Sequence, residues 1–372
     1  MRRPPIRHLE LAGSPEAMGD AHGRAHADEI RHYARDRVEL VAGGLWSGGP
    51  LPPGAVLELA EACLPAHESF SPGLHAEMLA MAGAAGITPA EAVVVGGFTD
   101  FVDTVRAVSG GAHPPETIED DCTAFVVPDS RAGGAGFLGQ TWDMHDTATD
   151  HVVLVRLRPD DGPDALVFTT VGCLGQIGMN SAGVCVGINN LTGNDGRLGV
   201  VWPTVVREML ARTTAPEALD VLLRAGLAGA HNYLILDAEG RGFNVEAMPS
   251  ARPVQAVTDE PLAHTNHVTD PAAAPFEGER DTEVMANSRR RLELATAMLA
   301  GTSKPLDAER LMEITREPTA ICRWPDPKYR VESSGAVIMR PRTGDFWACW
   351  GQPADNDYQH FSLVPAAASR RV

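Results

Sequence analysis

A single cysteine lies where the chain changes character, and its position suggests chemistry. The stretch PPETIEDDCTAFVVPDS, from Pro114 to Ser130, places Cys122 directly after two aspartates and directly before an apolar run that predicts a buried strand. A free cysteine is most often a small buried hydrophobe. We interpret the other five in that way; they are Cys63, Cys173, Cys185, Cys322 and Cys349. Cys122 differs because it opens a strand at the boundary between a helix-rich and a strand-rich part of the chain.

Cleavage of the peptide bond between Asp121 and Cys122 would make Cys122 an amino-terminal residue. Its α-amino group would then have an unperturbed pKa near ~8, close to the ~8.5 of its own thiol. One residue would supply both the nucleophile and the base, so no histidine would be needed. The thiol could also make the cut itself, by attacking the carbonyl of Asp121 and passing through a thioester. The pattern therefore allows a self-processing enzyme.

The elements around Cys122 divide into a helical first third and a strand-rich remainder. Helices are predicted over most of Ser14 to Leu59, and over 72–85 and 88–97, each with its own amino-terminal cap. After Cys122, short apolar or alternating runs separated by Gly, Pro and Asp predict strands. One helix is predicted in PTVVREMLARTTAPEALDVLLRAG, a long one over 282–300, and a final pair of strands in GAVIMRPRTGDFWACWGQP. This order favours stacked sheets flanked by helices.

Six short motifs, in this order along the chain, resemble those of a known family. They are DDCTAFVV, GQTWDMH, GVCVGINNLTG, AHTNHVTDP, ANSRRRL and ICRWPDP. The set is similar to the acyl-coenzyme A:6-aminopenicillanic-acid acyltransferase family of self-processing amino-terminal nucleophile (Ntn) hydrolases, which is related more distantly to penicillin V acylases and bile salt hydrolases. The resemblance runs from GSPEAMGDAHG almost to the end of the chain. It implies an α+β fold, a four-layer αββα sandwich with a helix-rich amino-terminal segment.

The resemblance also implies how the chain is divided. A single Ntn-hydrolase domain would span 1–372, and Cys122 matches the nucleophile that autocatalytic cleavage releases from Asp121. Residues 1–121 would then be a helix-rich α chain or propeptide, and 122–372 the catalytic β chain. The acidic segment that ends at Asp121 would be the loop that leaves, so the uncleaved chain would be a zymogen.

Further site residues follow from the same motifs. Asp143 in TWDM matches the carboxylate that holds and orients the freed α-amino group. Asn266 in HTNH matches an amide that donates to the oxyanion, and Asn190 in INNL matches its partner through a backbone N–H. Asn189 is expected to orient substrate or the loop.

Arg289 in NSRRRL matches the family arginine near the nucleophile, where its guanidinium would fix Asp143 or lower the pKa of the thiol. The neighbouring Arg290 and Arg291 are interpreted as a solvated helix face. Trp142 and His267 are expected to contact substrate.

A metal site is not expected beside Asn266. His264 and His267 flank that residue, but their spacing places them on opposite faces of a strand, and no acidic or cysteine partner completes a ligand set nearby.

The chain departs from the family at Asp121, where the resemblance predicts glycine, whose missing Cβ permits a strained turn. Cleavage that is slower, cleavage assisted by the carboxylate, and no cleavage all stay open. Gln140 stands where the hydrolase branch tends to have arginine, which favours the acyltransferase-like branch.

The leading hypothesis is a self-cleaving cysteine amidohydrolase or acyltransferase that acts on a small amide or acyl donor through an acyl-thioester on Cys122. One alternative is a conventional thiol hydrolase that stays uncleaved and uses His145 or His267 as its base. Another is a binding protein that kept the fold and lost catalysis. Hydrolysis and acyl transfer use the same residues, so the sequence does not separate them.

Composition limits the partners. A formal net charge of -18 opposes binding to nucleic acid or to anionic membranes. No apolar run approaches membrane-spanning length, no signal peptide is evident, and six cysteines without C-x-x-C spacing favour a reducing compartment, so we expect a cytoplasmic protein. No bound cofactor is expected, and coenzyme A would enter only as an acyl carrier. The expected partners are a small-molecule substrate and the cleaved amino-terminal fragment, and homo-oligomerisation is left open.

Overall fold

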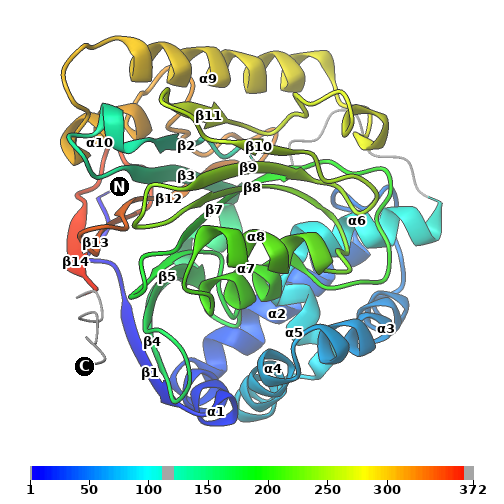
Figure 1. Cartoon of the computed structure of the whole chain (residues 1–372). Helices are drawn as coiled ribbons and strands as arrows, with labels where there is room; N and C mark the ends of the chain where they lie inside the picture. Colours follow the sequence, from blue (N-terminus) through cyan, green and yellow to red (C-terminus); the bar gives the residue numbers. More distant parts are fainter. Residues whose placement is uncertain (1, 111–120, 364–372) are drawn as a thin grey trace.

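Two β-sheets pack face to face with helices on both outer sides (Figure 1) in the computed structural model, which describes residues 2–110 and 121–363. This arrangement is the four-layer αββα sandwich that the resemblance implies, so the predicted fold class is confirmed. The acidic segment at 114–120, which was expected to leave on cleavage, lies outside the described residues.

The larger sheet has eight strands in the described part of the chain. Their order is β1 (His8–Gly13), β4 (Val152–Pro159), β5 (Ala165–Thr170), β6 (Ile177–Asn180), β7 (Cys185–Leu191), β8 (Ala230–Leu236), β9 (Gly242–Ala247) and β10 (Val254–Ala256). The smaller sheet has six over the same residues. Their order is β11 (Leu262–His264), β2 (Ala124–Val127), β3 (Phe137–His145), β12 (Val331–Arg340), β13 (Asp345–Trp350) and β14 (Gln359–Ser362). Neighbours are antiparallel except β1 and β4, which are parallel.

The helices form the two outer layers. Those on the side of the larger sheet are α1 (Pro15–Ala25), α2 (Ala27–Ala42), α3 (Pro53–Phe70), α4 (Pro72–Ala85), α5 (Pro89–Gly96), α6 (Phe98–Ser109), α7 (Trp202–Leu210) and α8 (Ala215–Arg224). Those that cover the smaller sheet are α9 (Thr282–Ala300) and α10 (Ala308–Thr315) (Figure 1).

Strand β2 is buried on both faces because it lies between two hydrophobic clusters. Ala124 and Val126 belong to the large cluster that includes the space between the sheets, whereas Phe125 and Val127 belong to the cluster beneath α9 and α10. This alternation is the period of two that an extended chain imposes. Cys122, two residues before Ala124, belongs to the first cluster.

A buried glutamine ties the two sheets together beside the site. Gln140 of β3 donates from Nε2 to the carbonyl of Ile188 of β7 at 3.0 Å, and its Oε1 accepts from the Ile188 N–H at 2.8 Å. Both polar atoms are therefore satisfied without water. The bridge holds the end of β7, which carries Asn189 and Asn190, next to the start of β2.

The segment predicted as one helix before β8 is two helices, so that prediction is wrong. Helix α7 ends at Leu210, and α8 begins after Thr214, whose side chain accepts from the Glu217 N–H at 3.3 Å. Pro216 occupies the first turn of α8, where its missing N–H costs nothing, but it could not sit in the interior of a continuous helix.

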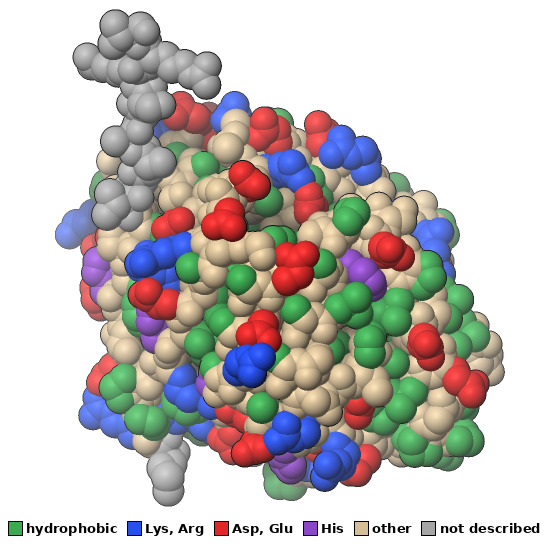
Figure 2. All heavy atoms as spheres, turned by 90° about the horizontal axis from the view of Figure 1, so that it is seen from below, with side chains coloured by type: hydrophobic (Ala, Val, Ile, Leu, Met, Phe, Trp, Pro, Cys, Tyr) green, Lys and Arg blue, Asp and Glu red, His purple; other side chains and the backbone are tan. Residues whose placement is uncertain are grey.

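No single helix within residues 2–110 and 121–363 has both the length and the apolar composition to cross a membrane; the pair α4 and α5, bent by 108°, meets those criteria when taken together. On the face of the molecule in Figure 2, the described acidic and basic side chains are interspersed. Apolar side chains gather on one side of that face.

Candidate active site

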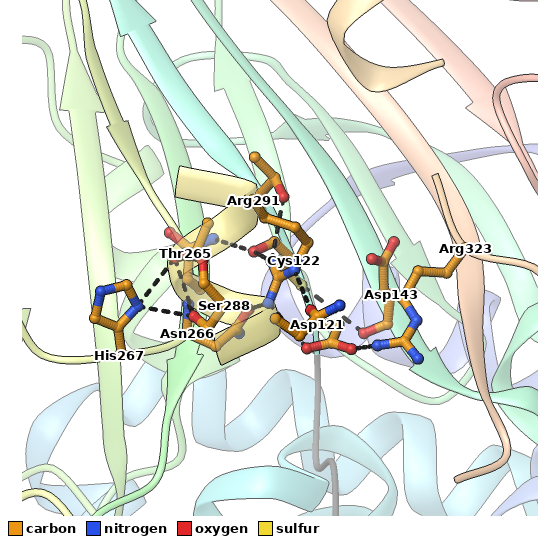
Figure 3. Close-up of polar contacts among 12 residues, drawn as sticks. Asp121, Cys122, Asp143, Thr265, Asn266, His267, Ser288, Arg291 and Arg323 are labelled. Atoms are coloured by element: carbon orange, nitrogen blue, oxygen red, sulfur yellow. Dashed lines mark hydrogen bonds and ion pairs between the residues drawn. The ribbon is translucent and has the colours of Figure 1, made fainter. Parts of the chain in front are cut away.

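Cys122 is held at the amino-terminal end of β2 by contacts to its backbone and its thiol (Figure 3). Its carbonyl oxygen accepts from Arg291 Nη1 at 2.8 Å and from Asn189 Nδ2 at 3.1 Å. Its Sγ lies 3.8 Å from the carbonyl oxygen of Asp143, and the residue is fully buried. Two side-chain donors on one carbonyl fix the backbone of the cysteine, while the thiol stays beside β3.

Asp143 lies next to Cys122 because β2 and β3 are paired. It is fully buried, and its Oδ1 accepts from Ser333 Oγ at 2.6 Å, from the position directly opposite in β12. Ser333 Oγ also accepts from the backbone N–H of Arg323 at 2.9 Å. The serine therefore sets the direction of the carboxylate. No sequence motif pointed to Ser333, because it becomes a neighbour only through strand register.

Asn266 follows β11 and contacts the backbone of Asn190. Its Nδ2 donates to the carbonyl of Asn190 at 3.0 Å, its Oδ1 accepts from Arg291 Nη2 at 3.0 Å, and its backbone N–H donates to Ser288 Oγ at 3.0 Å. The second N–H of Nδ2 has no partner within the described residues. A fixed amide with one remaining donor is suited to stabilise an oxyanion.

The arginine at the site is Arg291, so the assignment of Arg291 to a solvated face is wrong. Its side chain is fully buried and contacts Cys122, Asn266 and Asp121. Arg289 is exposed. Two residues along a helix correspond to a turn of about 200°, so the two side chains leave α9 on opposite faces.

A sequence signal for Arg291 does exist. The buried residues of α9 are Val284, Ser288, Arg291, Ala295 and Leu299. Their spacings of four, three, four and four are those of one helix face. Arg291 is therefore the member of the arginine run that falls on the buried stripe.

Asp121 is also part of the cluster. Its carboxylate accepts from Arg291 Nη2 at 2.9 Å and forms an ion pair with Arg323 on its other oxygen (Figure 3). The Asp121 side chain is 1% exposed, and those of Arg291 and Arg323 are 0% and 14% exposed. The motifs assign no role to Arg323, although it lies in the ICRWPDP motif that contributes to the resemblance.

The two histidines considered as bases have other partners. His267 Nδ1 lies 2.8 Å from Ser288 Oγ and 3.2 Å from Thr265 Oγ1, and His145 Nδ1 lies 3.0 Å from Thr147 Oγ1. Burial and nearby positive groups lower the pKa of each to about 4, so both are neutral near pH 7. Over its described residues, the structure shows no hydrogen bond between either imidazole and the Cys122 thiol.

Trp142, expected to contact substrate, packs edge-on against Phe168 in the core between the sheets, with ring centroids 6.2 Å apart. His264, which flanks Asn266, lies 3.0 Å from Glu246 Oε1. Over the part of the chain that the structure describes, no group of three or more His, Cys, Asp or Glu is arranged to hold a metal ion.

Burial raises the pKa of the other five thiols, in two cases to about 12, so they are protonated and poorly nucleophilic at neutral pH. This agrees with their interpretation as core residues.

Comparisons with known proteins agree with the motifs. The family model of acyl-coenzyme A:6-aminopenicillanic acid acyl-transferase matches residues 130–355, a range that includes Asp143, Asn266 and Arg291 and begins after Cys122. The 40 kDa form of acyl-coenzyme A:6-aminopenicillanic-acid-acyltransferase from Emericella nidulans is 25% identical over 263 residues, which cover 70% of this chain and 69% of that protein.

Two solved structures are more remotely similar. A mutant conjugated bile acid hydrolase from Clostridium perfringens is 11% identical, with a TM-score of 0.45, over 65% of this chain and 96% of that one. Penicillin V acylase from Agrobacterium tumefaciens is 12% identical, with a TM-score of 0.35, over 69% of this chain and 83% of that one.

Proposed function

The chain belongs to the acyl-coenzyme A:6-aminopenicillanic acid acyl-transferase family, and on that premise we propose that it is a cysteine amidohydrolase or acyltransferase that cleaves itself between Asp121 and Cys122. The observation that carries the proposal is the position of Cys122. It starts a buried strand, its carbonyl is held by Asn189 and Arg291, and its thiol lies beside β3.

Self-cleavage begins at the peptide bond between Asp121 and Cys122. The thiol adds to the carbonyl carbon of Asp121, a carbon–sulfur bond forms, and the carbon–nitrogen bond breaks. The thiol proton goes to the leaving amine, which becomes the α-amino group of Cys122. Water then hydrolyses the thioester, which gives a carboxylate on Asp121 and restores the thiol. The products are the fragments 1–121 and 122–372.

Turnover uses the same groups in new roles. The free α-amino group of Cys122 takes the thiol proton as the sulfur attacks the substrate carbonyl, and returns it to the leaving group. Asp143, oriented by Ser333, holds that amine. The free N–H of Asn266 and the backbone of Asn190 stabilise the oxyanion, for about 3 kcal/mol per donor.

The acyl group on Cys122 then passes to water or to an amine. Because the Emericella nidulans relative is named as an acyl-coenzyme A acyltransferase, we include a coenzyme A thioester among the donors to be tested. Small-molecule amides are the other substrate class. Exclusion of water from the site decides between transfer and hydrolysis.

An uncleaved hydrolase with a histidine base is less well supported, because a pKa lowered to about 4 makes His145 and His267 weak bases and both are hydrogen-bonded elsewhere. A binding protein without catalysis has no reason to keep Cys122, Asp143 and Asn266 in one buried network. We therefore retain the self-cleaving enzyme.

The proposal also places the protein in a reducing compartment such as the cytoplasm, since its six cysteines are free and buried. Recovery of the native protein from a secreted fraction would contradict this.

A trapping experiment tests the catalytic role. The protein is mixed with butanoyl-coenzyme A or an N-butanoyl anilide, quenched in acid, and digested for mass mapping. The expected acyl group is on Cys122, and it disappears in Cys122→Ala but persists in the control Cys173→Ala. Product analysis with and without an added amine then separates transfer from hydrolysis. An acyl group that persists in Cys122→Ala would contradict the proposal.

A further inference from the structure

The residue before the nucleophile carries a carboxylate that is buried between two guanidinium groups. Asp121 Oδ1 accepts from Arg291 at 2.9 Å, and Oδ2 is paired with Arg323 (Figure 3). The two arginines come from different elements, α9 and the segment before β12, and converge on one carboxylate. A single acidic side chain with two arginines from separate segments is a built anion site, in contrast to a surface ion pair.

Asp121 supplies the carboxylate that both guanidinium groups share. Arg291 also donates to neutral oxygens of Cys122, Thr123, Asn266 and Asn287. Buried cations that lose a paired carboxylate are strongly destabilised, because the interior does not replace the lost solvation. Once Asp121 withdraws, another anion is favoured in its place.

Asp121 must withdraw before a substrate can react, since its own carbonyl is bonded to the nitrogen of Cys122 in the uncleaved chain. The acyl group that Cys122 first attacks is therefore the aspartyl group of Asp121. Its carboxylate is separated from the reacting carbonyl by two carbon atoms, Cα and Cβ. In the uncleaved chain this group occupies the place of a substrate acyl group.

We propose, resting on the self-cleavage argued above, that Arg291 and Arg323 form a carboxylate subsite for the acyl group of the substrate. The preferred substrates are amides or thioesters of four-carbon dicarboxylic acids, of the succinyl or aspartyl type. Attack by the thiol forms the carbon–sulfur bond of a succinyl thioester and releases the amine with the thiol proton; water or an acceptor amine then removes the succinyl group. The carboxylate itself takes no part in bond making.

The charge of the acyl group decides how strongly the enzyme prefers a succinyl substrate over a butanoyl substrate. A butanoyl group has the same chain length without the carboxylate, so it does not replace the Asp121 carboxylate between Arg291 and Arg323. A hydrogen bond to a charged group is equivalent to roughly 10- to 100-fold in an equilibrium constant. We expect N-succinyl-4-nitroanilide to exceed N-butanoyl-4-nitroanilide by at least about tenfold in kcat/KM.

The test uses the cleaved protein with these two anilides and with N-glutaryl-4-nitroanilide, which is one methylene longer. Release of 4-nitroaniline gives kcat/KM for each. The variant Arg323→Gln should reduce the ratio of kcat/KM for the succinyl and butanoyl anilides to near one, and Arg323→Lys should restore part of that ratio. The control Arg290→Gln changes an exposed neighbour of Arg291 on α9 and should leave the ratio unchanged. Protection of Cys122 against iodoacetamide by succinamate, compared with butanamide, gives a second readout that needs no turnover.

The outcomes are distinct. A succinyl preference that Arg323→Gln removes supports the subsite. A cleaved chain that hydrolyses both anilides equally, or a preference unchanged in Arg323→Gln, overturns it and leaves the proposed function standing. If no anilide turns over, equal protection by the two amides overturns it. A chain that stays uncleaved and is never acylated on Cys122 contradicts the proposed function itself.

Discussion

Replacing Asp121 by asparagine should destabilise the uncleaved chain far more than a surface substitution does. Asp121→Asn keeps the shape of the side chain and removes its charge. In the structure this leaves Arg291, with a fully buried side chain, and Arg323, with a side chain 14% exposed, without their shared carboxylate. Because breaking a buried ion pair by removing one partner costs about 3–5 kcal/mol, we expect a loss near ~3 kcal/mol in the free energy of unfolding.

The assay is urea denaturation, with every variant made in a Cys122→Ala background so that the chain stays whole. Arg323→Gln and the double variant with Asp121→Asn complete a double-mutant cycle, and a coupling energy of about 1–3 kcal/mol is expected for side chains in direct contact. The control Arg290→Gln should change the free energy of unfolding by less than about 0.5 kcal/mol. If Asp121→Asn has an effect as small as the control and the coupling is near zero, the buried ion pair does not stabilise the uncleaved chain.

Two further predictions concern the amino-terminal helices. Burial, with smaller contributions from His26 and Arg207, lowers the pKa of His22 from 6.5 to about 3. Between these values the unfolded chain binds a proton that the folded chain does not, so the free energy of unfolding should fall by about 1.4 kcal/mol per unit as the pH drops below 6.5. His22→Gln should remove that part of the slope in urea denaturation at pH 7 and pH 5; an unchanged slope would show that His22 is not its source. Gly19→Ala would place a Cβ 2.1 Å from the backbone oxygen of Glu77, so it should lower the melting temperature by several degrees. In the control Gly83→Ala the added Cβ would have no described heavy atom within 4 Å outside its own helix, so the melting temperature should stay unchanged or rise. Equal shifts in the two variants would contradict the close packing of α1 on α4.

Much of the site could be predicted because motif order identifies residues independently of their distance in space. Cys122, Asp143, Asn190 and Asn266 were selected in this way, and the structure brings them into one network. Ser333 could not be found from the sequence, because it meets Asp143 only through the register of β12 with β3.

Motif order alone did not identify the two arginines that contact Asp121, Arg291 and Arg323. A run of three arginines on a helix sends its side chains in three directions, and only the buried stripe of α9 selects Arg291. Arg323 approaches Asp121 from a segment about two hundred residues away in sequence, and no local pattern encodes that contact.

Some elements of the fold could also be predicted from local sequence signals, and others could not. Helices α4 and α9 were predicted at their observed bounds because their caps are explicit in the sequence. The break between α7 and α8 was missed, since the apolar periodicity continues on both sides of Thr214 and Pro216. Strand β1 was also missed, because six residues that pair in parallel with a distant strand, β4, carry little local signal.

The intact mass of the purified protein under denaturing conditions shows whether the chain cleaves itself between Asp121 and Cys122. We predict two species, residues 1–121 and residues 122–372 with Cys122 at the amino terminus, and a single 39.5 kDa chain in Cys122→Ala. An active protein that remains one chain of 39.5 kDa would show that catalysis does not depend on self-cleavage.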